Sequence, residues 1–140
     1  MAPVLRAFHY SFVVRDLEEA RRFYVDIVGC REGRSAATWI DFELFGNQLS
    51  CHVGTPVPPA FSGRVDDIAV PMPHFGVIVT FAEYDALAAR VTAAKIPFVV
   101  TPRIRYAGEV GEQGTCFFLD PSGNAIEIKA FRRAEEVFAR

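Results

Sequence analysis

The sequence has few cysteines, no long apolar run and no excess of charge of one sign, and each of these gaps excludes a class of protein. Its three cysteines are odd in number and form no Cys-x-x-Cys pair, which predicts buried, reduced thiols and no disulfide framework. The longest apolar stretches have the length of a strand, so no segment is expected to span a bilayer. A net charge of −2 with scattered Lys and Arg lacks the basic stripe that binds nucleic acid.

The first residues also lack the apolar segment of a signal peptide, so we expect a cytoplasmic protein. Apolar residues, by contrast, are abundant. They make up 51% of the 140 residues, and phenylalanine is frequent among them. A chain of this length and composition can bury a core without disulfides, which predicts one packed domain over residues 1–140.

Residues 7–53 predict the element order β-α-β-β-β. Residues 7–14 alternate as a strand, with His9 on one face and Phe12 on the other. Asp16, with Glu19 three residues later, is typical of a helix N-terminus, and Gly29 is typical of a helix end. Strands are then predicted near 31–37, 38–45 and 47–53, the last two joined by a tight turn at Gly46-Asn47.

Residues 74–131 predict the same order again. A strand at 74–79 leads to Thr80 and Glu83, which have the spacing of a capping box, and Pro97 ends the helix that follows. Further strands are predicted near 98–105, 114–119 and 124–131, and a short helix in the tail from Arg132 to Arg140. Between the two modules, residues 54–73 are rich in Pro and Gly and are predicted to be a linker, with Val65-Asp-Asp-Ile-Ala-Val as an extended piece.

Three side chains of the kind that bind metals stand on these strands. His9 and His74 open the two modules, and Glu127 lies among apolar neighbours on the last strand. Two imidazoles and one carboxylate can occupy one face of a divalent ion and leave the other face open to a substrate. Alternatively, each histidine could be a hydrogen-bonded sheet residue, and Glu127 could face solvent or pair with Arg103 or Arg105. A buried, unpaired carboxylate is costly, which favours the metal.

The doubled β-α-β-β-β order, with these ligand types at both first strands and at the final strand, resembles the vicinal oxygen chelate superfamily of glyoxalases, bleomycin-resistance proteins and extradiol dioxygenases. The most specific segment is Phe117-Phe-Leu-Asp-Pro-Ser-Gly-Asn-Ala-Ile-Glu127, which looks like the family's closing turn and strand. The resemblance implies an α+β fold in which two βαβββ modules form a curved mixed-sheet cleft. It also implies that His9, His74 and Glu127 hold a divalent metal at the floor of that cleft.

In glyoxalase I, a fourth protein ligand comes from the last strand of the first module. Gln48, Ser50 and His52 share one face of the corresponding strand here, so any of them could face the metal. If His52 does, three nitrogens and a carboxylate close the site. If it is an ordinary sheet residue, about three positions stay open, which suits oxygen activation or bidentate chelation of a substrate.

The catechol-cleaving dioxygenases place a histidine and a tyrosine upstream of the metal glutamate. Phe117 occupies the tyrosine position here, and the histidine window contains Glu109 instead. This argues against ordinary catechol cleavage, unless Tyr106 or Glu109 takes over the proton transfer. In a glyoxalase-like isomerisation, Glu127 itself would be the candidate base.

Arg103, Arg105 and Tyr106 lie at a strand end and in the loop after it, which in this architecture borders the mouth of the cleft. Their guanidinium groups could bind a carboxylate or phosphate of the substrate, or they could belong to a charged edge strand. Trp39 could line an apolar pocket or pack within the sheet.

The sequence thus predicts a divalent-metal-dependent enzyme that acts on a small, oxygen-rich substrate. A dioxygenase-like site is narrowly favoured because its three-ligand pattern is matched without substitution, so Fe2+ is preferred over Mn2+, Ni2+, Zn2+ or Co2+. The alternatives are a glyoxalase-like lyase or isomerase and a metal-free binder of the bleomycin-resistance kind. We expect a two-fold homodimer with no nucleic-acid or membrane partner.

Overall fold

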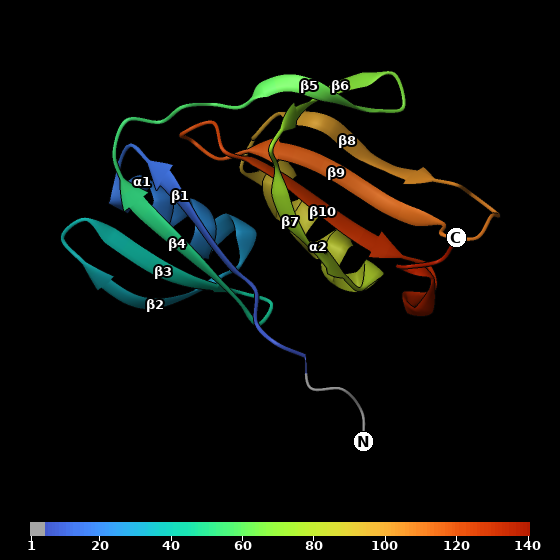
Figure 1. Ribbon diagram of the computed structural model, residues 1–140, viewed down its shortest axis with the longest axis horizontal. Helices are drawn as coiled ribbons and strands as arrows, with labels where there is room; N and C mark the ends of the chain where they lie inside the picture. The colour runs from blue at the N-terminus through green and yellow to red at the C-terminus, as the bar shows by residue number, and fades with distance from the viewer. Residues whose placement is uncertain (1–4) are drawn as a thin grey trace. The chain divides into compact units, whose positions relative to one another are not determined.

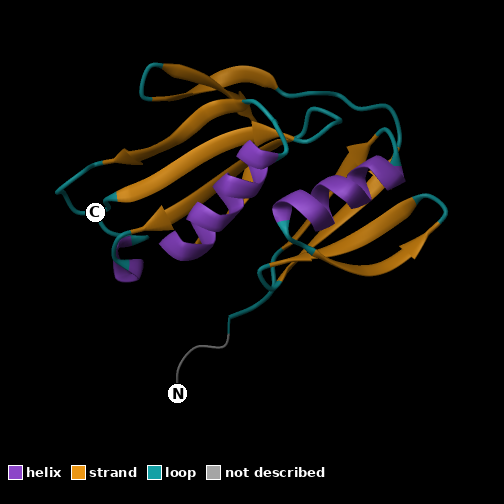
Figure 2. Ribbon diagram, turned by 180° about the vertical axis from the view of Figure 1, so that it is seen from behind, coloured by secondary structure: helices purple, strands orange, loops and turns teal. Residues whose placement is uncertain are grey.

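The computed structural model describes residues 5–140, and these fall into two compact units with a boundary between Pro56 and Val57. Each unit contains a four-stranded mixed sheet with a helical segment against one of its faces (Figures 1 and 2). The α+β class and the doubled β-α-β-β-β order are therefore confirmed. No helix within residues 5–140 combines the length and the apolar character that crossing a membrane requires.

Unit 1 (residues 5–56) is built from one helical segment and four strands in the sheet order β1-β4-β3-β2. The first and last strands in sequence, β1 and β4, are parallel, and the other pairs are antiparallel. Its elements are β1 (His9–Val14), α1 (Leu17–Arg21), the π-helical continuation η1 (Arg22–Val28), β2 (Arg31–Ala36), β3 (Trp39–Leu44) and β4 (Asn47–Val53).

The helical segment of unit 1 begins and ends where the sequence predicts. Asp16 Oδ1 accepts a hydrogen bond from the Glu19 backbone N–H at 2.7 Å, and Gly29 ends the segment with a left-handed φ of 92°. The turn between β3 and β4, however, lies one residue earlier than expected. Phe45 and Gly46 form it with φ values of 47° and 84°, as a type I′ turn requires, so Asn47 already belongs to β4.

Unit 2 (residues 57–140) contains a hairpin, one helix and a second four-stranded sheet in the order β7-β10-β9-β8. As in unit 1, the first and last strands of the sheet are parallel. Its elements are β5 (Ala60–Val65), β6 (Ile68–Met72), β7 (Phe75–Val79), α2 (Phe81–Ala93), β8 (Phe98–Arg105), β9 (Gln113–Leu119), β10 (Ala125–Phe131) and a single 3-10 turn, Ala134–Glu136.

Most of the predicted linker is a β-hairpin, because β5 and β6 pair through the turn at Asp66-Asp67. Its Val65 and Val70 pack with Val100 and Phe117 in a buried cluster of unit 2. The Pro and Gly content indicated a loop, but burial of these valines on the sheet outweighs it. Two smaller differences concern the ends of helices: α2 ends at Ala93, ahead of Pro97, and the tail contains only the 3-10 turn.

Each sheet buries one face against its helical segment. The opposite face is mostly polar in unit 1, whereas in unit 2 it also carries Val100 and Phe117, which pack against Val65 and Val70 of the hairpin. In β3, Ile40, Phe42 and Leu44 are buried against the helical segment, where Phe42 stacks on Tyr24 with 5.5 Å between ring centroids. In β10, Ile126 and Ile128 are fully buried in the same way. We call the opposite face of each sheet its open face. By strand alternation, the open faces carry every predicted metal ligand on a strand.

Candidate metal and substrate site

His74 and Glu127 face each other in unit 2. His74 lies just before β7 and Glu127 on β10, and His74 Nε2 is 3.3 Å from Glu127 Oε1. The Nδ1 atom of His74 is 2.7 Å from the backbone carbonyl oxygen of Pro71. Because that oxygen can only accept, Nδ1 must carry a proton. A neutral His74 therefore presents the lone pair of Nε2 to a carboxylate, and two acceptors at this distance require a proton or a metal cation between them.

Neighbouring side chains hold this pair in place. Thr115 Oγ1 donates a hydrogen bond to Glu127 Oε2 at 2.6 Å, which leaves Oε1 to face His74. The ring of Phe117 contacts His74 edge-on, with 4.8 Å between centroids. Gly76 pairs with Glu127, and a Cβ at Gly76 would come within 1.5 Å of the Glu127 carbonyl oxygen, so no other residue fits there without a backbone shift. Outer contacts of this kind orient metal ligands in proteins.

In unit 1, the Nδ1 atom of His9 also faces an oxygen acceptor. Its Nδ1 is 2.8 Å from Gln48 Oε1, so Nδ1–H donates and the lone pair resides on Nε2. Gln48 Nε2 in turn lies 3.4 Å from Asp41 Oδ2, and Ser50 donates to Asp41 Oδ1 at 2.6 Å. Sequence reasoning missed Asp41, although the alternation of β3 places it on the same face as Trp39.

The registers of the two sheets identify equivalent positions. In unit 2, Glu127 pairs with Gly76, two residues after His74. In unit 1, Ser50 pairs with Ser11, two residues after His9. Ser50 is therefore the counterpart of Glu127. His52 lies two residues further along β4, is exposed and pairs with Trp39 on β3. Its role as a fourth ligand remains a prediction.

The predicted metal trio is divided between the units. His9 belongs to unit 1, whereas His74 and Glu127 belong to unit 2. Taken separately, neither residues 5–56 nor residues 57–140 contain three His, Cys, Asp or Glu side chains grouped as a metal site. The structure thus brings together two of the three predicted ligands.

The predicted substrate-binding arginines are engaged with the β5–β6 turn. Arg103 Nη1 and Arg105 Nε lie 3.7 and 3.3 Å from the carboxylate of Asp66. Tyr106 has a left-handed φ of 57° and an exposed ring beneath the Arg105 guanidinium, 4.9 Å from its centroid. The register places β8 two strands from β10 and pairs Arg105 with Gln113, four residues from Phe117. The backbone of Arg105 is therefore roughly 16 Å from that of Glu127, and Tyr106 lies one residue further away.

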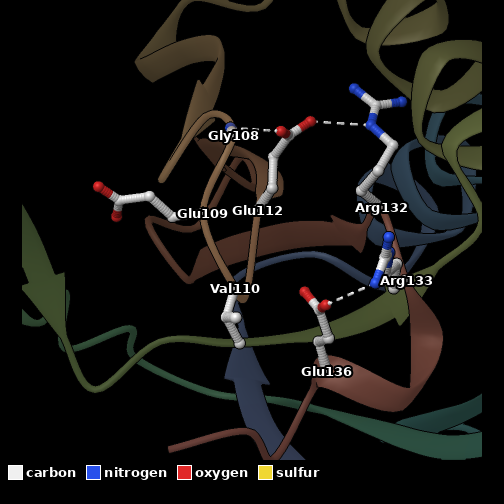
Figure 3. Close-up of a pocket in the computed structure, with 7 residues that line it drawn as sticks. All are labelled: Gly108, Glu109, Val110, Glu112, Arg132, Arg133 and Glu136. Carbon is white, nitrogen blue, oxygen red and sulfur yellow. Dashed lines mark hydrogen bonds and ion pairs between the residues drawn. The ribbon is translucent and has the colours of Figure 1, made fainter.

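Glu109 lies in the loop between β8 and β9, beside a cavity of about 300 Å³ (Figure 3). Glu112 holds this loop in place. Its carboxylate accepts a hydrogen bond from the Gly108 N–H at 2.7 Å and forms an ion pair with Arg132 Nε at 2.9 Å. These contacts, the Gly108 hydrogen bond first, lower the pKa of the Glu112 carboxyl. Glu136 adds a second tie by accepting from the Gly111 N–H at 2.6 Å. Glu112 and Glu136 therefore pair with Arg132 and Arg133 beside this cavity (Figure 3).

Comparison with known proteins identifies the family to which this fold belongs. The family model described as Glyoxalase/Bleomycin resistance protein/Dioxygenase superfamily matches residues 6–128. A crystal structure titled glyoxalase/bleomycin resistance protein/dioxygenase, from Alicyclobacillus acidocaldarius, is 29% identical, with 99% of this chain and 100% of that chain covered and a TM-score of 0.77.

The fosfomycin resistance protein FosX from Listeria monocytogenes, complexed with Mn(II) and sulfate, is 21% identical, with 96% and 95% covered and a TM-score of 0.67. FosX from Mesorhizobium loti is 20% identical, with 95% and 98% covered and a TM-score of 0.64. At these identities the likeness to FosX shows a shared fold. A search of curated protein sequences found no match. Since the family model spans most of the chain, this protein belongs to the glyoxalase/bleomycin resistance protein/dioxygenase superfamily.

Proposed function

We propose that this protein is a divalent-metal-dependent enzyme that binds a small, oxygen-rich substrate, with His9, His74 and Glu127 as the metal ligands. The observation that carries the proposal is the 3.3 Å approach of His74 Nε2 to Glu127 Oε1, with the Nδ1 proton of His74 committed to Pro71. Two ligands that each lie about 2.1 Å from one ion at a right angle are about 3 Å apart, so this pair fits a metal.

His9 supports the proposal because its Nδ1 atom is hydrogen-bonded to Gln48, which leaves the Nε2 lone pair available to bind a metal. A bound divalent ion would act as a Lewis acid that polarises substrate oxygens. The protein's own contribution is to hold both imidazoles in one tautomer and to aim Glu127 through the Thr115 hydroxyl.

Among the reaction classes, we narrowly favour dioxygenase-like chemistry with Fe2+. Ser50 stands where the other unit has Glu127, so unit 1 offers no carboxylate at that position and the three-ligand pattern is supported. A glyoxalase-like isomerisation with Glu127 as base is the second candidate. It is supported by Phe117, which is buried in place of the dioxygenase tyrosine and can donate no proton.

Anaerobic reconstitution separates these proposals. Purified protein is loaded in turn with Fe, Mn, Ni, Zn and Co, and bound metal is measured by elemental analysis. We expect about one ion per chain, lost in His9→Ala, His74→Ala and Glu127→Gln while circular dichroism stays native. The absence of binding by every metal would overturn the proposal in favour of a metal-free binder of the bleomycin-resistance kind.

The loaded forms are then assayed with a catechol panel under oxygen and with hemithioacetals. Oxygen uptake confined to the iron form supports dioxygenase-like chemistry. Conversion of hemithioacetals by the nickel form without oxygen supports the isomerase and reverses the preference.

We further propose that the chain forms a two-fold homodimer. β1 and β7 are the edge strands of their sheets, and Ile78 on β7 is 47% exposed. Unpaired edges with apolar side chains are sites at which chains associate. Light scattering at micromolar concentration is expected to give the mass of two chains, and a monomer there would contradict the dimer.

A further inference from the structure

The open face of unit 2 carries cations next to the metal carboxylate. The register aligns Glu127 with Phe117 on β9. Two residues further along β10, Lys129 pairs with Thr115 on β9, and Thr115 pairs in turn with Arg103 on β8. Because alternate residues of a strand share a face, Lys129 and Arg103 lie on the same face as Glu127 and on either side of Thr115. This row of Lys129, Thr115 and Arg103 lies next to Glu127, whose carboxylate accepts the Thr115 hydrogen bond.

Among the described residues of unit 2, Lys129 has no carboxylate partner. Its Nζ lies over the Phe131 ring, 5.4 Å from the centroid, and within residues 57–140 no Asp or Glu oxygen comes within ion-pair distance of it. The side chain is half-buried, so its charge is partly removed from water without compensation from an anion. A lysine here is also unusual for this chain, which has thirteen arginines and only one other lysine, Lys95.

Arg103 also has spare capacity for an anion. It shares the single carboxylate of Asp66 with Arg105, and its own contact is the longer one, 3.7 Å against 3.3 Å. Its other hydrogen bonds, to the carbonyl and hydroxyl of Thr101, are long, at 3.3 and 3.4 Å. The positive charges of Lys129, Arg103 and Arg105 therefore lie near two carboxylates, that of Glu127 on the sheet and that of Asp66 in the β5–β6 turn. A divalent ion on Glu127 would add to the positive excess.

We propose that Lys129 and Arg103 bind an anionic group of the substrate, a carboxylate or a phosphonate, while its other oxygens reach the metal. This inference rests on the proposed function and narrows its substrate class to small, oxygen-rich anions. Lys129 is two residues from Glu127, about 7 Å along the strand, so a few bonds separate the anionic group from the chelating oxygens. A charge-assisted hydrogen bond contributes about 1.5–3 kcal/mol in general, which corresponds to a tenfold or greater effect on affinity.

The presence of only two lysines permits a direct test. Reductive methylation with 13C-formaldehyde labels Lys95, Lys129 and the N-terminal amine and retains their charge. Titration of zinc-loaded protein with methylphosphonate, and separately with acetate, is followed by 13C NMR, with Lys95→Met and Lys129→Met used for assignment. We expect the Lys129 signal to shift saturably while the Lys95 signal stays fixed. A larger response to one anion shows which anionic group the site prefers.

Variants complete the test. Lys129→Met and Arg103→Met should each weaken methylphosphonate binding about tenfold, Lys129→Arg should retain it, and Lys95→Met should match the wild type. Zinc binding without a selective Lys129 shift for either anion would overturn the inference and leave the proposed function intact. A selective shift in protein that takes up no metal would support the anion site and refute the metal-dependent function. Equal shifts of both lysines would mean non-specific charge effects and would also overturn it.

Discussion

The two histidines that stand at the start of the sheets each direct their Nδ1 proton at an oxygen acceptor. For His74 the acceptor is the backbone carbonyl of Pro71. For His9 it is the side-chain amide oxygen of Gln48. Both imidazoles are thereby fixed in the tautomer that leaves Nε2 for a metal. If these residues bind a metal as proposed, single hydrogen bonds around them should control metal affinity, and two of these bonds can be tested separately.

Thr115→Val should weaken metal binding about 10- to 100-fold, because valine keeps the shape of threonine but removes the hydroxyl that holds Glu127 Oε2 at 2.6 Å. Competition with a fluorescent chelator measures the affinity. Thr55→Val, at an exposed position outside both sheets, is the control and should bind like the wild type. Unchanged affinity in Thr115→Val would mean that this hydroxyl does not orient the ligand.

Gln48→Leu should also lower metal affinity, because it removes the acceptor that fixes the His9 tautomer, and Gln48→Glu, which keeps an acceptor, should lower it less. His52→Ala should leave affinity unchanged, since the register makes Ser50 the counterpart of Glu127. The same chelator competition distinguishes the positions. Loss of metal in His52→Ala alone would instead identify His52 as a fourth ligand.

At the scale of elements, the cap of α2 joins the helix directly to the strand that follows His74. Thr80 and Glu83 form the predicted capping box, in which the Thr80 N–H donates to Glu83 Oε1 at 2.9 Å and the Glu83 N–H donates to Thr80 Oγ1 at 3.2 Å. Because β7 ends at Val79, this cap defines the point at which the strand gives way to the helix. Five residues separate His74 from it.

Thr80→Ala should lower the free energy of unfolding by about 1 kcal/mol at neutral pH, as measured by urea denaturation. Thr92→Ala, within the same helix, is the control. Its hydroxyl bonds back to the Ala88 carbonyl and caps nothing, so its loss should be close to neutral. A Thr80→Ala protein as stable as the wild type would show that the capping box contributes nothing net.

The effect of Thr80→Ala should also depend on pH. The hydrogen bond from the Thr80 N–H, followed by that of its hydroxyl, lowers the pKa of Glu83. A carboxyl with a lowered folded pKa stabilises the protein above its ordinary pKa, and this contribution is lost as the pH falls through the lowered value. The difference between wild type and Thr80→Ala should thus shrink in acid. A difference that is constant with pH would contradict this role for Glu83.

At the scale of the whole molecule, the reactivity of the three thiols measures how tightly the interior of each unit is packed. Cys30 in unit 1 and Cys116 in unit 2 are buried, and burial raises the pKa of each to about 12. Cys51 is buried as well. All three are free, which confirms the buried thiols that the sequence predicts. The thiolate is the reactive form, so none of the three is suited to act as a nucleophile.

Native protein at pH 8 should therefore react slowly with Ellman's reagent, and all three thiols should react at once in denaturant. The kinetics are followed by absorbance, and mass spectrometry of labelled peptides assigns each thiol. Rapid native labelling of Cys30 alone would show that unit 1 opens locally. Rapid labelling of Cys116 alone would show the same for unit 2.

The local features of this protein can be read from neighbouring residues in its sequence. The caps at Asp16 and Thr80, the helix end at Gly29 and the alternation of the strands depend on side chains a few residues apart, and the structure confirms them. The same local patterns, together with the family resemblance, suffice for the doubled β-α-β-β-β order. Local pattern fails where burial decides, as in residues 60–72, where the packing of Val65 and Val70 makes a hairpin of a Pro- and Gly-rich segment.

The contacts that orient the side chains of the site could be predicted only from the tertiary structure. That Thr115 holds Glu127, that Gln48 fixes His9, and that Lys129 and Arg103 flank Thr115 all follow from strand register. Register joins residues as far apart as the 39 positions between His9 and Gln48. Burial and backbone pairing across a whole sheet set it, and no short stretch of sequence contains that information.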